Sequence, residues 1–268
     1  MWLRQGPTTH TPGWSRDVLR LRSTSRDGGA RMTESSAGTH GSGHRIDAGD
    51  IGEPRWPMAV AVLATGGLHA VLAPALRSLP PELLGESRWA YLVVVAVLLG
   101  ILIVGDPGRI DREAKWLRVV TIAMIALISL DTVVVALRLA SAILNARPFT
   151  EDPKTLLLNG SAIWLSAVIA FALWYWEIDR GGPVGRARGP GGLPAFQFPE
   201  MGSPELVKAG WYPRFIDYLH MSFGTSTSFG PSDVSAIASW AKFSMMVESF
   251  VSLVIAVLVI GRAVNLLK

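Results

Sequence analysis

The chain has 268 residues, of which 50% are hydrophobic and 17% are charged, with a formal net charge of +4 and no cysteine. The lack of cysteine excludes disulfides, thiolate catalysis and cysteine-ligated metals, and the charged fraction is low for a soluble domain. Several apolar stretches approach the roughly 20 residues that cross a hydrocarbon core of about 30 Å. The composition therefore predicts a multi-pass membrane protein surrounded by a lipid bilayer.

The first 55 residues are rich in Gly, Ser, Thr and Arg and have almost no aliphatic periodicity. Such a composition buries too little apolar surface to offset the entropy of ordering, so residues 1–55 are predicted to be a disordered tail. The basic character of the chain comes mainly from arginines in this tail and in loops, where they orient the spans and meet anionic lipid. Nucleic acid is therefore not expected as a partner.

Five apolar stretches follow the tail and predict membrane spans. The first is the weakest because it contains two glycines, a histidine and a proline. The fourth ends in a Trp-Tyr-Trp triplet, which is typical of the headgroup interface. The fold class is therefore expected to be all-α, with about five transmembrane helices. The predicted spans cover approximately residues 57–76, 89–104, 119–144, 156–176 and 243–264.

The third span carries two charged residues, Asp131 and Arg138. A charge at mid-membrane costs about 2.5–3.5 kcal/mol on insertion scales, so Asp131 should face protein or water, and its functional interpretation is an ion or proton relay group. Arg138 lies near the helix end, where snorkelling to the interface is the favoured explanation. His69 and His220 are isolated and are expected to be hydrogen-bonded structural residues rather than metal ligands. No metal or cofactor is predicted.

The fourth span is followed by charged and Gly-rich sequence. Glu177, Asp179 and Arg180 are interpreted as an interfacial anchor with local ion pairs, with a ring around a vestibule as the alternative. Residues 181–192, which contain Pro and Arg and follow no strand, are interpreted as a linker. The chain has no G-x-S-x-G, H-E-x-x-H, P-loop or G-x-G-x-x-G motif. We therefore expect no enzyme activity.

A short interfacial helix is predicted over residues 214–223, because Pro213 is tolerated at a helix start. The next ten residues, 224–233, are small and hydroxylic, with two glycines and one proline, so neither helix nor strand is favoured there. At membrane depth, irregular backbone is tolerated only where it is buried in protein or lines water. The segment therefore predicts a re-entrant pore helix and loop.

Residues 211–266 resemble the pore module of tetrameric potassium channels, in which a pore helix precedes a T-x-T-T-x-G-Y-G-D filter and an inner helix. Pro231 replaces the filter tyrosine, and Ser232 replaces the second glycine. These residues are poorly suited to a backbone whose carbonyl groups point inward in a row, as a potassium filter requires. A wider, hydroxyl-lined opening or a closed plug is therefore the alternative. The filter and ion path that the resemblance implies comprise Thr225, Thr227, Ser228, Phe229, Gly230, Pro231, Ser232 and Asp233.

The resemblance continues through the last apolar stretch, which is similar to inner helices of bacterial two-helix channel modules that carry an acid at mid-helix and an arginine near the end. Glu248 and Arg262 occupy these places, which implies Glu248 in the cavity. Ser244, Glu248 and Ser252 recur every four residues and share one helix face, so a water-facing stripe is plausible. The alternative is an interhelical hydrogen bond from Glu248 to a Ser or Thr of a neighbouring helix.

The entire chain also resembles a group of bacterial multi-pass membrane proteins through three segments. These are the WYWEIDRGGP run that starts at Trp174, the FP dipeptide at Phe198 and the WYPRFIDYLHMSF segment that starts at Trp211. This resemblance implies no particular activity. It indicates that the parts after the fourth span form one functional unit.

Together these observations divide the chain into a tail (1–55), a three-helix transmembrane region (56–150) and a channel-like pore module (151–268). Counts of Lys and Arg place the N-terminus in the cytoplasm of a cell-membrane protein. A potassium-channel module in its usual sense enters from outside, which here requires an external N-terminus. Either the module is inverted or the first segment does not span the membrane.

The expected function is the passage of monovalent cations through a homo-tetrameric pore-loop path, with Asp233 concentrating cations at one mouth. One alternative is a non-conducting scaffold or accessory subunit with the same fold. The other is a proton-coupled transporter that uses Asp131, although the internal repeats that many transporters show are not evident.

Overall fold

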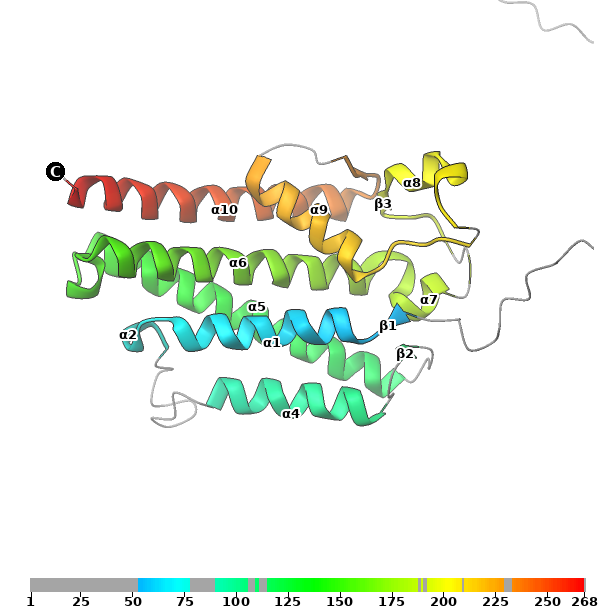
Figure 1. Cartoon of the computed structure of the whole chain (residues 1–268), viewed down its shortest axis with the longest axis horizontal. Helices are drawn as coiled ribbons and strands as arrows, with labels where there is room; N and C mark the ends of the chain where they lie inside the picture. Colours follow the sequence, from blue (N-terminus) through cyan, green and yellow to red (C-terminus); the bar gives the residue numbers. More distant parts are fainter. Residues whose placement is uncertain are drawn as a thin grey trace, which may run out of the picture. The chain divides into compact units, whose positions relative to one another are not determined.

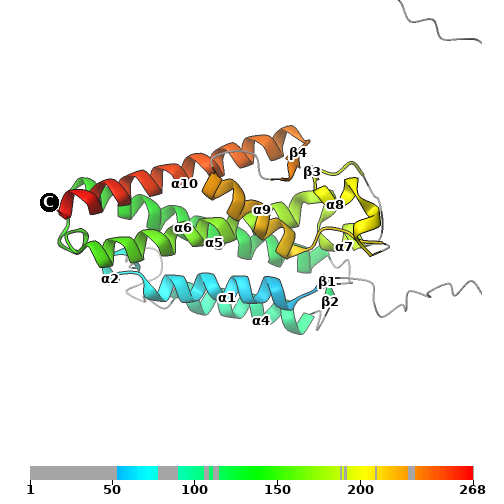
Figure 2. The same ribbon diagram turned by 45° about the horizontal axis from the view of Figure 1, so that its top comes forward.

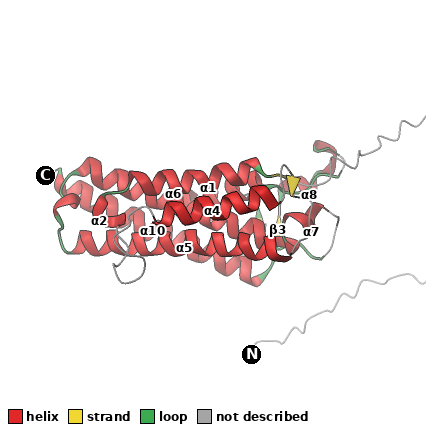
Figure 3. Cartoon of the chain, turned by 90° about the horizontal axis from the view of Figure 1, so that it is seen from below, coloured by secondary structure: helices red, strands yellow, loops and turns green. Residues whose placement is uncertain are grey.

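The computed structural model describes residues 53–77, 90–105, 109–110, 115–187, 189, 192–208, 210–228 and 233–267. These residues are mostly helical (Figure 3). Three of their helices are long and apolar enough to cross a membrane: α5 (Lys115–Leu144), α6 (Pro153–Ile178) and α10 (Ser239–Leu266). Two shorter apolar helices, α1 (Trp56–Val71) and α4 (Ala90–Gly105), have 16 residues each.

The helix bounds follow from local sequence. Helix α6 begins at Pro153 because Asp152 caps it, with Oδ2 accepting from the backbone N of Thr155 at 2.9 Å. Helix α1 stops at Val71, shortly before Pro74, which disfavours a helical residue ahead of it. The predicted first span, residues 57–76, is therefore wrong as one helix: α1 is followed by a separate turn of helix, α2 (Pro74–Arg77).

Helix α6 lies at the centre of the bundle, and α1, α5, α9 and α10 all pack against it. Figure 1 and Figure 2 show α10 and α4 at opposite edges, with α4 packed on α1 and α5. Over its most apolar stretch 61% of α6 is buried, against 17% for α10. Small side chains allow this close packing in an apolar setting. The buried small residues of α6 are Gly160, Ala162, Ala167, Ala170 and Ala172.

One apolar core runs through the described chain. It contains side chains of α1, α4 and α5 together with side chains of α6 and α9, for example Met58, Leu99, Ile125, Leu173 and Met221. Residues on both sides of the predicted domain boundary at 150 and 151 therefore share this core. A second cluster joins α2, α5, α6 and α10.

Two short antiparallel ribbons lie at one end of the helices. Strand β1 (Glu53–Pro54) pairs with β2 (Arg109–Ile110), and β3 (Phe196–Gln197) pairs with β4 (Ser235–Ala236). Since β1 precedes α1 and β2 precedes α5, the first pair brings the starts of these helices to the same end. The remaining short elements are η2 (Pro148–Thr150), η3 (Asp179–Gly181), α7 (Pro183–Ala187), α8 (Pro199–Gly202), η4 (Pro204–Leu206) and α9 (Phe215–Ser228).

The predicted tail, residues 1–55, falls almost wholly outside the described residues. Its last three residues are ordered, which corrects the prediction for them: Glu53 and Arg55 are buried, and Glu53 pairs with Ile110 across the β1–β2 ribbon. Their local sequence gives no apolar pattern. Contacts with residues far along the chain hold them in place.

Candidate functional site

Helix α9 starts at the end of the bundle where α6 finishes. The backbone N of Phe215 donates to Glu53 Oε1 at 2.5 Å, directly ahead of α1. One turn later, Tyr218 Oη donates to Asp179 Oδ2 at 2.5 Å, directly after α6. These two buried hydrogen bonds fix the first turn of α9 against the ends of two long helices.

The last turns of α9 lie near the middle of α6 and more than a third of the way along α10. Ser222 Oγ is hydrogen-bonded to the carbonyl oxygen of Val168, in the middle of α6, at 2.8 Å. Ser249 Oγ donates to the carbonyl oxygen of Thr225 at 3.3 Å, and Ser249 lies about 15 Å along α10 at 1.5 Å per residue. Helix α9 therefore runs obliquely from the bundle end towards its middle (Figure 2).

The chain after α9 comes back to the end where it started. Ser235 and Ala236 form β4, which pairs with β3 and leads into the first residue of α10. Pro213 and Ser235 thus lie at the same end of the bundle. The C-terminal turn of α9, which comes between them in the sequence, lies further inside the bundle. We call the segment from Phe215 to Ala236 the α9 hairpin.

The predicted end of this helix at Phe223 is wrong. Helix α9 continues to Ser228, so Gly224 to Ser228 are helical rather than irregular. The hydroxyl groups in these turns bond back to carbonyls four residues earlier, Thr225 Oγ1 to Met221 O and Thr227 Oγ1 to Phe223 O, both at 2.9 Å, an arrangement that does not itself favour the helix. Packing of α9 against α6 and α10 outweighs the weak helix propensity of Gly, Ser and Thr.

The residues of the implied filter lie in different surroundings in the structure. Thr225 is buried within the chain and Thr227 is exposed. Ser228 is the last residue of α9, and Asp233 is exposed just ahead of β4. The remaining four predicted filter residues, Phe229, Gly230, Pro231 and Ser232, lie outside the described residues.

Glu248 lies in a buried network that joins α6, α9 and α10. The residue is 1% exposed. Its Oε2 accepts from Tyr175 Oη at 2.7 Å, and its Oε1 is hydrogen-bonded to Ser226 Oγ at 3.0 Å and to Ser222 Oγ. No ion pair among the described residues includes Glu248. We call these four side chains the Glu248 network.

This arrangement matches the interhelical hydrogen bond that was the alternative for Glu248. Within the chain, Glu248 and Ser252 are buried and Ser244 is half-buried, so the predicted water-facing stripe is covered by protein over most of its length. Their role in a cavity of an assembled pore stays a prediction.

A second buried polar cluster surrounds the start of α9. Arg186 Nη1 donates to the carbonyl oxygens of Trp176 (2.6 Å) and Asp179 (2.9 Å), and its guanidinium lies 4.9 Å from the ring centre of Tyr218. Trp176 Nε1 donates to Glu53 Oε2 at 2.8 Å. We call this group the end cluster, and its members are Glu53, Trp176, Asp179, Arg186, Phe215 and Tyr218.

The end cluster corrects the interpretation of residues 181–192 as a linker. Residues 183–187 form α7, and Arg186 is buried. Asp179 is fully buried and its Oδ1 accepts from the backbone N of Ala195 at 2.8 Å, which a simple interfacial anchor does not require. The predicted local ion pair is present, with Arg180 Nε 3.4 Å from Asp179 Oδ2. Glu177 pairs with Arg118 at 3.1 Å.

Burial raises the pKa of Glu53, and the hydrogen bonds from Phe215 and Trp176 together with the nearby Arg186 and Arg214 oppose that rise. Sequence reasoning missed Glu53 and Arg186 because both lie in polar, Gly- or Pro-rich stretches. A signal was nevertheless present in the second resemblance. Its three segments meet here, since Phe198 packs edge-on against Tyr218 with ring centres 5.2 Å apart, and Trp176 packs in the same way against Phe215.

Asp131 lies away from both clusters and pairs with His69. The distance from His69 Nδ1 to Asp131 Oδ2 is 2.9 Å, which joins α1 to α5 and agrees with a hydrogen-bonded histidine. Arg138 Nη1 donates to the carbonyl oxygen of Leu76 at 3.0 Å. Arg138 therefore has a partner within the chain, and its snorkelling to the interface stays a prediction. No group of three His, Asp or Glu side chains among the described residues is arranged to hold a metal ion.

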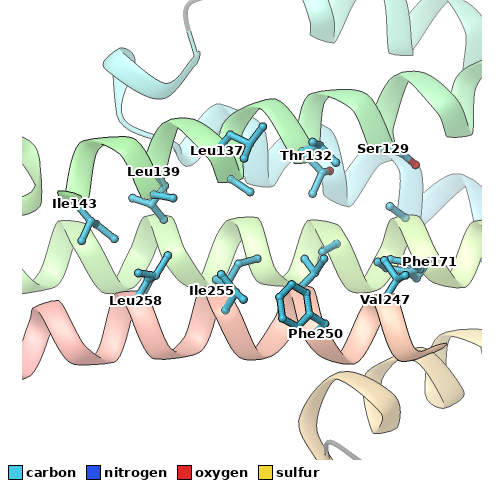
Figure 4. Close-up of a pocket in the computed structure, with 18 of the residues that line it drawn as sticks. Ser129, Thr132, Leu137, Leu139, Ile143, Phe171, Val247, Phe250, Ile255 and Leu258 are labelled. Carbon is cyan, nitrogen blue, oxygen red and sulfur yellow. The ribbon is translucent and has the colours of Figure 1, made fainter. Parts of the chain in front are cut away.

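A cavity of about 320 Å³ lies between α5, α6 and α10 (Figure 4). Its lining is apolar apart from Ser129 and Thr132, and Ser129 Oγ accepts from Trp174 Nε1 at 2.8 Å. Such a lining offers no charge to an ion.

No protein-family model, curated protein or solved structure matches this chain. A function for it is therefore argued from the geometry of the α9 hairpin and its surroundings.

Proposed function

We propose that the protein is a multi-pass integral protein of the cell membrane in which α1, α4, α5, α6 and α10 cross the bilayer and α9 enters it halfway. We propose further that α6, α9 and α10 of four copies form a path for monovalent cations. The observation that carries the proposal is the α9 hairpin, whose two ends lie at one end of the bundle while its helix terminus lies near the middle of α6 and more than a third of the way along α10.

The terminus of α9 suits a cation. The last four carbonyl groups of a helix lack partners within that helix, and the helix dipole places about half a negative charge there. Of the four in α9, only the Thr225 carbonyl has a hydroxyl partner among the described residues. The exposed Thr227 adds a hydroxyl, and the exposed Asp233 adds a negative charge at the mouth. The proposed path thus keeps the residues of the predicted filter, Thr225, Thr227, Ser228 and 229–233, and the buried Ser226 supports it.

The outer face of α10 supports an assembly. A single hairpin cannot enclose a path, so several copies must meet. The side chains on this face that are more than half exposed in one chain are Phe243, Met246, Phe250, Val257, Ile260 and Val264. Exposed apolar rows of this kind are covered by lipid or by another subunit, and a homo-tetramer follows the resemblance to the tetrameric pore module.

The proposed orientation has the N-terminus in the cytoplasm. The β1–β2 ribbon, the end of α6 and the start of α9 lie at one end of the bundle, and basic residues gather in their segments, which favours that end as cytoplasmic. The α9 hairpin then enters from the cytoplasm, inverted relative to a potassium channel. The basic residues in question are Arg55, Arg109, Arg118, Arg180, Arg186 and Arg214.

A non-conducting scaffold is the second candidate. It is favoured by the burial of Thr225 and Ser226, whose hydroxyls are occupied by Met221 and Glu248 of the same chain. In that case the α9 hairpin is a packing element that fixes α6 to α10. The proton-coupled transporter is a third candidate, and the contact between Asp131 and His69 is the observation in its favour.

Purified protein in liposomes is expected to pass potassium or sodium ions down a gradient. Asp233→Asn should reduce this flux severalfold at low ionic strength, because it removes the charge that concentrates cations at the mouth, and less so at high salt, where exposed charges are screened. Asp131→Asn should leave the flux unchanged. Glu205→Gln, at an exposed position in η4, serves as the control for loss of a surface charge.

Two outcomes would contradict the cation path. A stable oligomer that passes no ion under any gradient would support the scaffold. Flux that requires a pH gradient and disappears only in Asp131→Asn would support the transporter.

A further inference from the structure

The hydrogen-bonding partners of Ser222 indicate the protonation state of Glu248. Ser222 Oγ lies within hydrogen-bonding distance of two oxygen atoms, the backbone carbonyl of Val168 at 2.8 Å and Glu248 Oε1. A serine hydroxyl has one proton to donate, and a carbonyl and an ionised carboxylate are both pure acceptors. If Glu248 is ionised, the single proton of Ser222 can serve only one of the two contacts. The other contact then brings two acceptor oxygens together without a proton between them.

A proton on Glu248 removes this conflict. A carboxylic acid donates one hydrogen bond and still accepts others. Glu248 then donates to Ser222, and Ser222 donates to Val168 O, which gives a continuous chain of hydrogen bonds from α10 through α9 to α6. Tyr175 Oη still donates to the second carboxyl oxygen at 2.7 Å.

In the described part of the chain, the groups around Glu248 offer no positive charge that would stabilise an anion. Helix α6 presents the Tyr175 hydroxyl, which among the described residues is the only other titratable group bonded to Glu248, and α9 presents the hydroxyls of Ser222 and Ser226. No Lys, Arg or His among the described residues lies within 4.0 Å of the carboxyl group. One turn along α10, Ser252 Oγ is buried without a hydrogen-bond partner in the described part of the chain. Burial of an uncompensated carboxylate is strongly unfavourable.

We propose that Glu248 is a proton-binding site that is occupied at neutral pH, and that this proton holds α9 against α6 and α10. Loss of the proton breaks the chain of hydrogen bonds at Ser222 and weakens the attachment of α9. Since α9 carries the proposed cation path, proton release would alter the position of its C-terminal turn. The inference concerns the same three helices as the proposed function but does not depend on conduction.

Infrared difference spectroscopy of the full-length protein tests the occupancy directly. The spectrum of the wild type minus that of Glu248→Gln at neutral pH should contain the carbonyl stretch of a protonated carboxylic acid, and this band should shift in D₂O. The same subtraction with Glu151→Gln, which changes an exposed acid just ahead of α6, should contain carboxylate bands and no acid carbonyl band. Carboxylate bands, with no acid carbonyl band, in the Glu248→Gln difference would overturn the proposal.

Amide hydrogen exchange tests the consequence for α9. Glutamine has an NH₂ group that donates and a carbonyl oxygen that accepts in place of the protonated acid, so Glu248→Gln should fold like the wild type. After correction for intrinsic rates, exchange in α9 of the wild type should accelerate at alkaline pH, whereas α9 of Glu248→Gln should not change. Identical pH profiles would overturn the proposed attachment. An acid band found in a protein that passes no ions would refute the cation path and leave this inference standing.

Discussion

Glu248→Ala is expected to lower the free energy of unfolding by about 2–4 kcal/mol. The substitution leaves the hydroxyls of Ser222, Ser226 and Tyr175 without their shared partner in the interior. An interhelical hydrogen bond in an apolar setting contributes about 0.6–1.7 kcal/mol, a buried polar group that loses its partner costs about 1–3 kcal/mol, and removal of the side chain adds a cavity. Reversible unfolding in mixed detergent micelles measures the change.

Two control variants separate the network from helix α10 itself. Glu248→Gln should retain most of the stability, because its amide group donates and accepts as the protonated acid does. Lys242→Ala, at an exposed position two turns earlier on α10, should have little effect. If Glu248→Ala were no more destabilising than Lys242→Ala, the Glu248 network would not hold these three helices together.

Gly160→Ala is expected to lower the free energy of unfolding by about 1–3 kcal/mol through overpacking. A Cβ atom at Gly160 would lie 2.6 Å and 2.8 Å from the two γ-carbons of Val259 and 3.2 Å from its Cβ. Rotation of the valine side chain does not move its Cβ, so α6 and α10 must separate. The same unfolding titration measures the loss.

The compensating change tests whether this contact is the cause. Val259→Ala removes both γ-carbons, so the double variant Gly160→Ala with Val259→Ala should be more stable than the sum of the two single effects predicts. Gly261→Ala, on α10 with open space around its Cβ position, should be neutral or slightly stabilising. Strict additivity of Gly160 and Val259 would contradict direct contact between the helices at this point.

The apolar helices could be predicted from sequence because their signal is local. Long apolar runs predicted α5, α6 and α10 to within a few residues at either end. The break in the first predicted span also has a local cause, Pro74, whose effect on a helix outweighs the apolar character of the residues around it. The prediction treated Pro74 as a weakness of the span rather than as its end.

The polar clusters could not be predicted because their partners lie far apart in the sequence. Glu53 bonds Phe215 across 162 positions, and Tyr175 bonds Glu248 across 73. The extension of α9 to Ser228 has the same origin. Its Ser and Thr residues have weak helix propensity, and only packing against α6 and α10 makes the last turns helical. The sequence placed the candidate residues on α9 and α10 only as neighbours along the chain, and their mutual contacts required the fold.

Labelling of single cysteines tests the proposed entry and return of the α9 hairpin most directly, and the absence of native cysteine gives a clean background. Exposed positions suit the test: Arg214→Cys and Asp233→Cys flank the α9 hairpin, and Lys154→Cys lies at the opposite end of α6. A membrane-impermeant maleimide should label 214 and 233 in inverted vesicles, and 154 only in intact cells. Labelling of 214 and 233 from opposite sides of the membrane would contradict the α9 hairpin as a half-crossing element.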